Sequence, residues 1–133
     1  MTLTRLQWIA LGYAAVLFAA AALNYVPGIT DLEGRAFGIF ALDIYDDLLH
    51  IVSGLWALWS GIASPRAARL FLTWFGLAYL GDGILGVFTG VGYLDLGICR
   101  FGVQDYGLVF NILASAPHVI LGGFAVVAAR LWR

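Results

Sequence analysis

Four long apolar segments are the feature that most constrains how this chain can fold. They cover about residues 6–26, 44–62, 69–90 and 109–131. Each has close to the ~20 residues that an α-helix needs to cross the hydrocarbon core of a bilayer. With 62% hydrophobic and only 11% charged residues, the chain is more apolar than a soluble domain of its size. The sequence therefore predicts an all-α integral membrane protein, a four-helix bundle that forms one transmembrane domain over residues 1–133.

The arginines predict how the segments are oriented in the membrane. Basic residues concentrate in the short loops on the cytoplasmic side. Arg35 and Arg100 fall on one side of the predicted bundle. The side that holds both termini carries Arg5, Arg66, Arg69, Arg130 and Arg133. We therefore predict that both termini are cytoplasmic and that the lipid bilayer is the main partner of the chain.

Several other functions are excluded or not favoured by the composition. The net charge is −1 and the sequence has no basic cluster, so nucleic acid is not expected as a partner. Cys99 is the only cysteine, so the chain has no disulfide, CxxC redox pair or thiolate metal site. No HExxH, Gly-x-Ser-x-Gly or Walker pattern occurs. We predict no catalytic residues, and the sequence does not favour an enzyme.

Ionisable residues inside the apolar segments mark the candidate functional site. At a rise of 1.5 Å per residue, His50, Asp82 and His118 lie ~9, ~12 and ~13 Å below the outer membrane surface. Asp46 and Asp47 precede His50 by about one helical turn. Charged side chains are costly in lipid, so we expect these five residues, the polar layer, to line a pocket that opens outward.

The second and fourth apolar segments share a short pattern. A shift of 68 residues places His50 on His118 and Gly54 on Gly122, so both segments contain His-x-x-x-Gly. The pattern suggests a parallel internal repeat, in which the first two segments correspond to the last two. A glycine one turn below each histidine leaves room for a neighbouring helix or for a flat ligand.

One interpretation of the polar layer is structural. Hydrogen bonds among its side chains can hold helices in register, as in an accessory subunit of a larger membrane assembly. The glycine-rich third segment would then pack against other membrane subunits or against a second copy of the chain. A proton or cation path through Asp82 and the histidines is a further alternative, although the inner half of the bundle offers few polar residues to continue it.

Two further interpretations involve a cofactor. A transition metal would be bound by the imidazoles of His50 and His118 together with a carboxylate from Asp82, Asp47 or Asp46.

Haem b would instead take the two histidines as axial ligands, and Gly54 and Gly122 would leave space beside the porphyrin.

Several motifs carry a resemblance to a known family. They are His50 and His118 in their His-x-x-x-Gly patterns and the third segment from Ala68-Arg69-Leu70-Phe71 through Tyr79 to Gly86. In these features, over roughly residues 40–130, the chain resembles a bacterial family of small four-helix membrane proteins of unknown function. The resemblance implies a helical bundle in the bacterial cytoplasmic membrane and assigns no chemistry.

Overall fold

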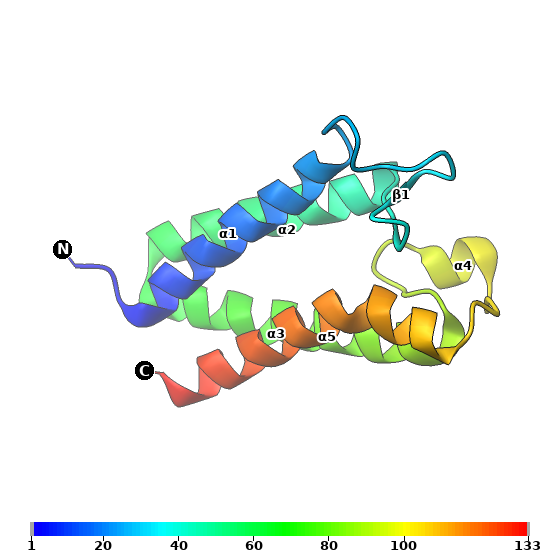
Figure 1. Cartoon of the computed structure of the whole chain (residues 1–133). Coiled ribbons are helices and arrows are strands. Elements are labelled where there is room, and N and C mark those ends of the chain that lie inside the picture. Colours follow the sequence, from blue (N-terminus) through cyan, green and yellow to red (C-terminus); the bar gives the residue numbers. More distant parts are fainter. Residues whose placement is uncertain (1, 133) are drawn as a thin grey trace.

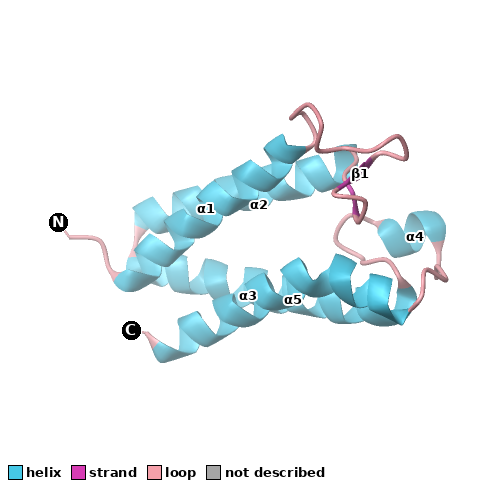
Figure 2. Ribbon diagram, in the orientation of Figure 1, coloured by secondary structure: helices cyan, strands magenta, loops and turns pink. Residues whose placement is uncertain are grey.

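The computed structural model describes residues 2–132, and four long helices make up most of it (Figures 1 and 2). They are α1 (Arg5–Leu23), α2 (Ile44–Ala63), α3 (Pro65–Thr89) and α5 (Leu108–Leu131). The all-α class is confirmed, and each long helix lies within a few residues of its predicted range. Arg133, which contributed to the predicted orientation, lies outside the described residues.

The structure has a fifth, short helix besides the four predicted ones, because the outer loops contain structure of their own. A short helix, α4 (Gly97–Phe101), precedes α5. A small antiparallel hairpin of β1 (Arg35–Ala36) and β2 (Phe40–Ala41) lies between α1 and α2. These elements span only five and two residues, too few for an apolar periodicity that would identify them in the sequence.

Capping residues explain where the helices begin. Asp43 accepts hydrogen bonds from the backbone N–H groups of Tyr45 and Asp46, at 2.9 and 3.2 Å, and so starts α2. Ser64 caps α3 through the N–H of Ala67 at 3.1 Å, and Pro65 occupies the first helical position. The third helix therefore begins four residues before the predicted start at residue 69, because proline is compatible with the first turn.

The helices form two pairs, α1 with α2 and α3 with α5 (Figure 1). The pairs diverge toward the end of the bundle that holds α4 and the hairpin, and both described chain ends lie at the opposite end. The hydrophobic core fills the half near the chain ends. It consists of Leu6, Ala10, Tyr13, Ala14, Leu17, Ala57, Ala68, Phe71, Leu72, Phe75, Tyr79, Ala125, Ala128 and Ala129.

Three of the helices, α1, α3 and α5, are long and apolar enough to cross a membrane, which identifies the chain as an integral membrane protein. α2 has 20 residues but is not among these three helices, and it contains Asp46, Asp47 and His50. The internal repeat stays a prediction. The connections within its two halves differ, because a hairpin follows α1 whereas α4 follows α3.

Candidate functional site

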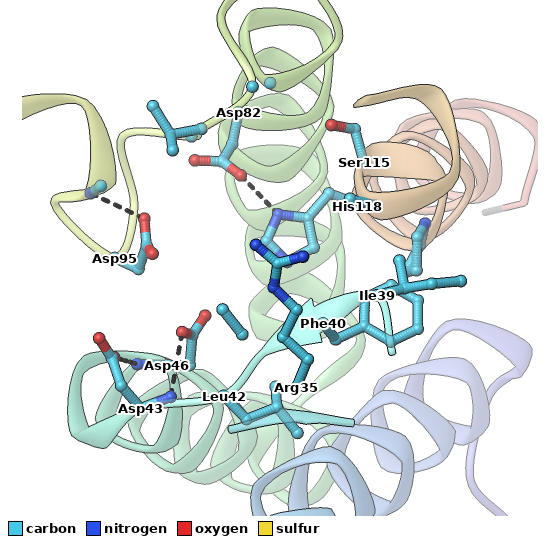
Figure 3. Close-up of a pocket in the computed structure, with 18 of the residues that line it drawn as sticks. Arg35, Ile39, Phe40, Leu42, Asp43, Asp46, Asp82, Asp95, Ser115 and His118 are labelled. Carbon is cyan, nitrogen blue, oxygen red and sulfur yellow. Dashed lines mark hydrogen bonds and ion pairs between the residues drawn. The ribbon is translucent and has the colours of Figure 1, made fainter. Parts of the chain in front are cut away.

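The candidate site is a cavity of about 400 Å³ at the end of the bundle that holds α4 and the hairpin (Figure 3). It lies where the two helix pairs diverge, and all four long helices contribute to its walls. Four of the five polar-layer residues line it: Asp46 and His50 from α2, Asp82 from α3, and His118 from α5. Apolar lining residues include Ala20, Leu23, Ile39, Phe40, Phe110 and Ala114.

Asp82 and His118 are in direct contact in the cavity wall (Figure 3). Asp82 Oδ2 lies 2.5 Å from His118 Nδ1, and the Asp82 side chain is buried. A carboxylate on Nδ1 fixes the orientation of an imidazole ring and leaves Nε2 for a further partner. One polar contact thus joins α3 to α5 at the depth that helical rise predicts.

The other oxygen of Asp82 holds the chain that follows α3. Its Oδ1 accepts the backbone N–H groups of Tyr93, at 2.6 Å, and Leu94, at 2.7 Å. The Tyr93 hydroxyl donates to the carbonyl of Ala78 at 2.5 Å. Both partners lie well before the end of α3, so segment 91–96 turns back along this helix instead of leaving the bundle. Non-helical backbone at membrane depth needs polar partners within the protein, and Asp82 supplies one.

His50 lines the cavity from α2 and is only 8% exposed. Its ring centroid lies 6.4 Å from that of His118, and the two rings are inclined by 80°. His50 Nδ1 is buried and has no hydrogen-bond partner among the described residues. Asp47, Ser60 and Asn111 also contain a buried polar atom without a partner among these residues, and none of the three lines the cavity.

The two carboxylates above His50 point in different directions. Asp46 lines the cavity and accepts the backbone N–H of Asp43 at 3.5 Å, which belongs to the cap of α2. Asp47 is buried outside the cavity lining and accepts a 2.8 Å hydrogen bond from the Tyr25 hydroxyl. This hydrogen bond to a carboxylate raises the pKa of Tyr25. Asp47 therefore links α2 to the chain after α1 and does not contribute to the cavity.

Gly54 and Gly122 do not border the cavity, contrary to the expectation that they make room for a flat cofactor. A Cβ atom on Gly54 would lie 2.8 Å from the ring of Phe18 in α1. A Cβ atom on Gly122 would lie 2.8 Å from the carbonyl oxygen of Gly76 in α3. Both glycines allow close helix packing. Neighbouring helices therefore occupy the space beside these glycines, which is the first of the two alternatives that the pattern offered, and haem binding by the two histidines stays a prediction.

The polar layer does not form a complete set of metal ligands. Within residues 2–132, no three His, Cys, Asp or Glu side chains lie close enough to hold a metal ion. Asp82 contacts His118, and Asp47 bonds to Tyr25. Metal binding by the remaining imidazole and carboxylate groups stays a prediction.

Two charged loop residues complete the cavity lining, and the sequence reasoning did not include them. The Arg35 guanidinium carbon lies 5.4 and 5.2 Å from the ring centroids of Tyr106 and Phe110. Asp95 lines the cavity and accepts the backbone N–H of Gly97 at 2.9 Å. Arg35 lies in β1 and Asp95 in the segment before α4, both on the predicted outer side. This location was the only feature of the sequence that could have placed them near the cavity.

α4 is attached to the start of α2 through Arg100. Its guanidinium lies 2.7 Å from Asp43 and over the ring of Tyr45, 3.9 Å from the centroid. Partial burial raises the pKa of Asp43, but Arg100 and the backbone N–H groups at the start of α2 lower it further, so the net pKa lies below its usual value. The pair holds Gly97 and Phe101, which line the cavity, beside α2.

Comparison with known proteins supports the predicted resemblance in part. A family model described as a domain of unknown function (DUF4383) matches residues 7–108. The match contains α1 to α4 and ends at the start of α5, so it includes His50 and Asp82 but not His118. No curated protein and no solved structure matches the chain.

Proposed function

The chain belongs to the family with the domain of unknown function DUF4383, and from this premise we propose that it is a membrane protein that binds a small ligand in its cavity. Four helices would span the bacterial cytoplasmic membrane. The arginines near the chain ends favour cytoplasmic termini, which puts the cavity on the outer side.

The distribution of side chains on α2 supports a fourth span. Its buried polar residues are Asp47, His50, Ser53 and Ser60. Its exposed residues are apolar over the full length of the helix and include Leu48, Val52, Leu55, Trp59 and Ile62. A helix that is polar inside and apolar outside suits lipid as its surroundings, because water would favour the reverse arrangement.

The observation that carries the ligand proposal is that the cavity contains polar groups left unsatisfied by the protein. Arg35 and Asp46 line the cavity and have no ion-pair partner within the described part of the chain. A polar network that only fixed helix register would satisfy its own members. Cavities with apolar walls and a few converging polar groups are typical ligand sites.

An accessory-subunit role has weaker support, because the glycines that would serve a partner are used within the chain. A Cβ atom on Gly76 would lie 2.8 Å from the side chain of Val126, and one on Gly83 would lie 2.8 Å from the backbone nitrogen of Val119. Both valines belong to α5. This part of the glycine-rich surface of α3 is therefore not free to pack against a second membrane protein.

Cys99 provides a test of the orientation, because it is the only cysteine and is exposed on α4. A membrane-impermeant maleimide added to intact cells is expected to label the wild-type protein and not Cys99→Ala. As a control, Cys99→Ala combined with Leu131→Cys carries a thiol at the opposite end of the bundle and should react only after permeabilisation. The reverse pattern would show the opposite orientation, and labelling of both in intact cells would contradict a spanning bundle.

A matched pair of substitutions on α5 tests the ligand site. Ala114 lines the cavity, whereas Ile112 is exposed on the same helix and is not part of the lining. We expect mass spectrometry of protein purified in mild detergent to find a small molecule at about one per chain in wild type and Ile112→Phe, and a loss of at least tenfold in Ala114→Phe. Retention in Ala114→Phe, or no such molecule in any of the three proteins, would refute the proposal.

A further inference from the structure

We infer that the cavity binds a zwitterion, in which a primary ammonium and an anionic phosphate or carboxylate are joined by a short linker. This inference rests on the proposed function, because it names the ligand class of the same cavity. Charges of both signs that lack ion-pair partners lie in the lining, and a zwitterion is the ligand that pairs with both.

Asp46 and Asp95 form the acidic part of the cavity (Figure 3). They come from α2 and from the segment before α4, and both line the same cavity. Asp43 also lines the cavity, but Arg100 neutralises it at 2.7 Å. The only hydrogen bonds to Asp46 and Asp95 come from backbone N–H groups within the described residues. A primary ammonium has three N–H donors with which to bridge such oxygens.

Arg35 forms the basic part of the cavity. It extends from β1 into the space that Figure 3 shows, with its guanidinium beside the aromatic rings of Tyr106 and Phe110. No carboxylate in residues 2–132 forms an ion pair with it. Its planar guanidinium can bind a phosphate or a carboxylate through two parallel hydrogen bonds.

His50 adds a third kind of polar side chain to the cavity lining. Its side chain is more than nine-tenths buried, lines the cavity, and keeps one ring nitrogen without a partner among the described residues. A neutral imidazole has one donor and one acceptor nitrogen, so it can bind either part of a zwitterion. The acidic cluster is thus not the only feature that favours a bound polar molecule.

The aromatic residues of the cavity favour a primary over a quaternary ammonium. Quaternary ammonium groups are bound by the faces of several aromatic rings. Here the rings of Tyr106 and Phe110 already contact Arg35, and the acidic part consists of carboxylates. Ethanolamine-type head groups should therefore bind more tightly than choline-type head groups.

Titration calorimetry on the full chain in a non-ionic detergent tests the inference with three probes. These are dihexanoyl phosphatidylethanolamine, dihexanoyl phosphatidylcholine and free phosphoethanolamine. We expect saturable binding of the ethanolamine lipid at about one per chain and at least tenfold weaker binding of the choline lipid. If free phosphoethanolamine binds as tightly as the lipid, the source of the head group is a soluble molecule; if only the lipid binds, the source is the bilayer.

Charge-removing variants identify the residues responsible. Asp46→Asn and Arg35→Gln should each weaken binding of the ethanolamine probe about tenfold or more, with thermal unfolding used to confirm that both remain folded. Asp46→Asn keeps an oxygen for the cap of α2. Glu33→Gln is the matched control, because Glu33 is exposed in the loop before β1 and lies outside the cavity lining. The affinity of Glu33→Gln for the ethanolamine probe should equal that of wild type.

The inference is overturned if both lipids bind equally, if Glu33→Gln weakens binding as much as Asp46→Asn, or if no probe binds. The co-purification experiment with Ala114→Phe separates this failure from failure of the proposed function. A molecule that is lost only from Ala114→Phe, together with no zwitterion binding, would leave the cavity as a ligand site of another chemical class.

Discussion

Replacement of Gly122 by alanine is expected to destabilise the bundle by about 1–3 kcal/mol, the usual cost of overpacking a well-filled contact. The new methyl group would meet the backbone of α3, 2.8 Å from the carbonyl oxygen of Gly76 and in contact with the backbone nitrogen of Leu80. Backbone atoms cannot rotate away as a side chain can. The two helices must therefore separate, and their other contacts weaken with them.

The adjacent residue provides the control for this prediction. A Cβ atom on Gly123 would have nothing within 4 Å, so Gly123→Ala should be neutral or stabilise the helix by up to about 1 kcal/mol. Thermal unfolding followed by circular dichroism in one detergent compares the two variants with wild type. Equal melting temperatures for both variants would mean that the backbones of α3 and α5 lie farther apart at Gly122 than the 2.8 Å distance requires.

Asp82→Ala is expected to have the largest effect among single substitutions at the cavity, about 3–5 kcal/mol, because it removes the shared partner of three polar groups, each of which costs about 1–3 kcal/mol when left unsatisfied. The substitution removes the 2.5 Å contact with His118 and the acceptor for the N–H groups of Tyr93 and Leu94. Segment 91–96 should then detach from α3. Thermal unfolding measures the global effect, and limited proteolysis measures the accessibility of the segment.

A double-mutant cycle separates the Asp82–His118 contact from the other contributions. His118→Ala alone leaves the Asp82 carboxylate buried with only its two backbone donors. The double variant should therefore lose less stability than the sum of the single variants, by about 0.5–3 kcal/mol. Asp105→Ala removes an exposed carboxylate and should change stability by less than about 0.5 kcal/mol. Additive effects would show that Asp82 and His118 act independently.

The depth of the polar residues could be predicted, because the rise of a helix is constant. His50, Asp82 and His118 were expected in one layer from their distance to the ends of the apolar segments, and all three line the same cavity. The direction of each side chain was not predictable in the same way. Asp46 and Asp47 are adjacent in the sequence, yet one lines the cavity and the other bonds to Tyr25.

The histidine–glycine pattern shows how one observation left two interpretations open, of which only close helix packing is seen at these glycines. A glycine one turn from a histidine indicates that something approaches the helix closely, and it does not say what approaches. At Gly54 the neighbour is Phe18, and at Gly122 it is the backbone of α3. Which helices are neighbours depends on contacts between residues far apart in the chain, so periodicity within one segment does not reveal it.

By itself, the sequence determined the helical class, the approximate extent of the four long helices and the shared level of His50, Asp82 and His118. These properties depend on local composition and on the hydrogen bonds that each helix makes within itself. The tertiary structure alone decided that segment 91–96 turns back to Asp82, that Arg35 and Asp95 join the lining, and that the two helix pairs diverge around a cavity. Those features depend on long-range packing, in which each side chain finds its partner only after the helices have assembled.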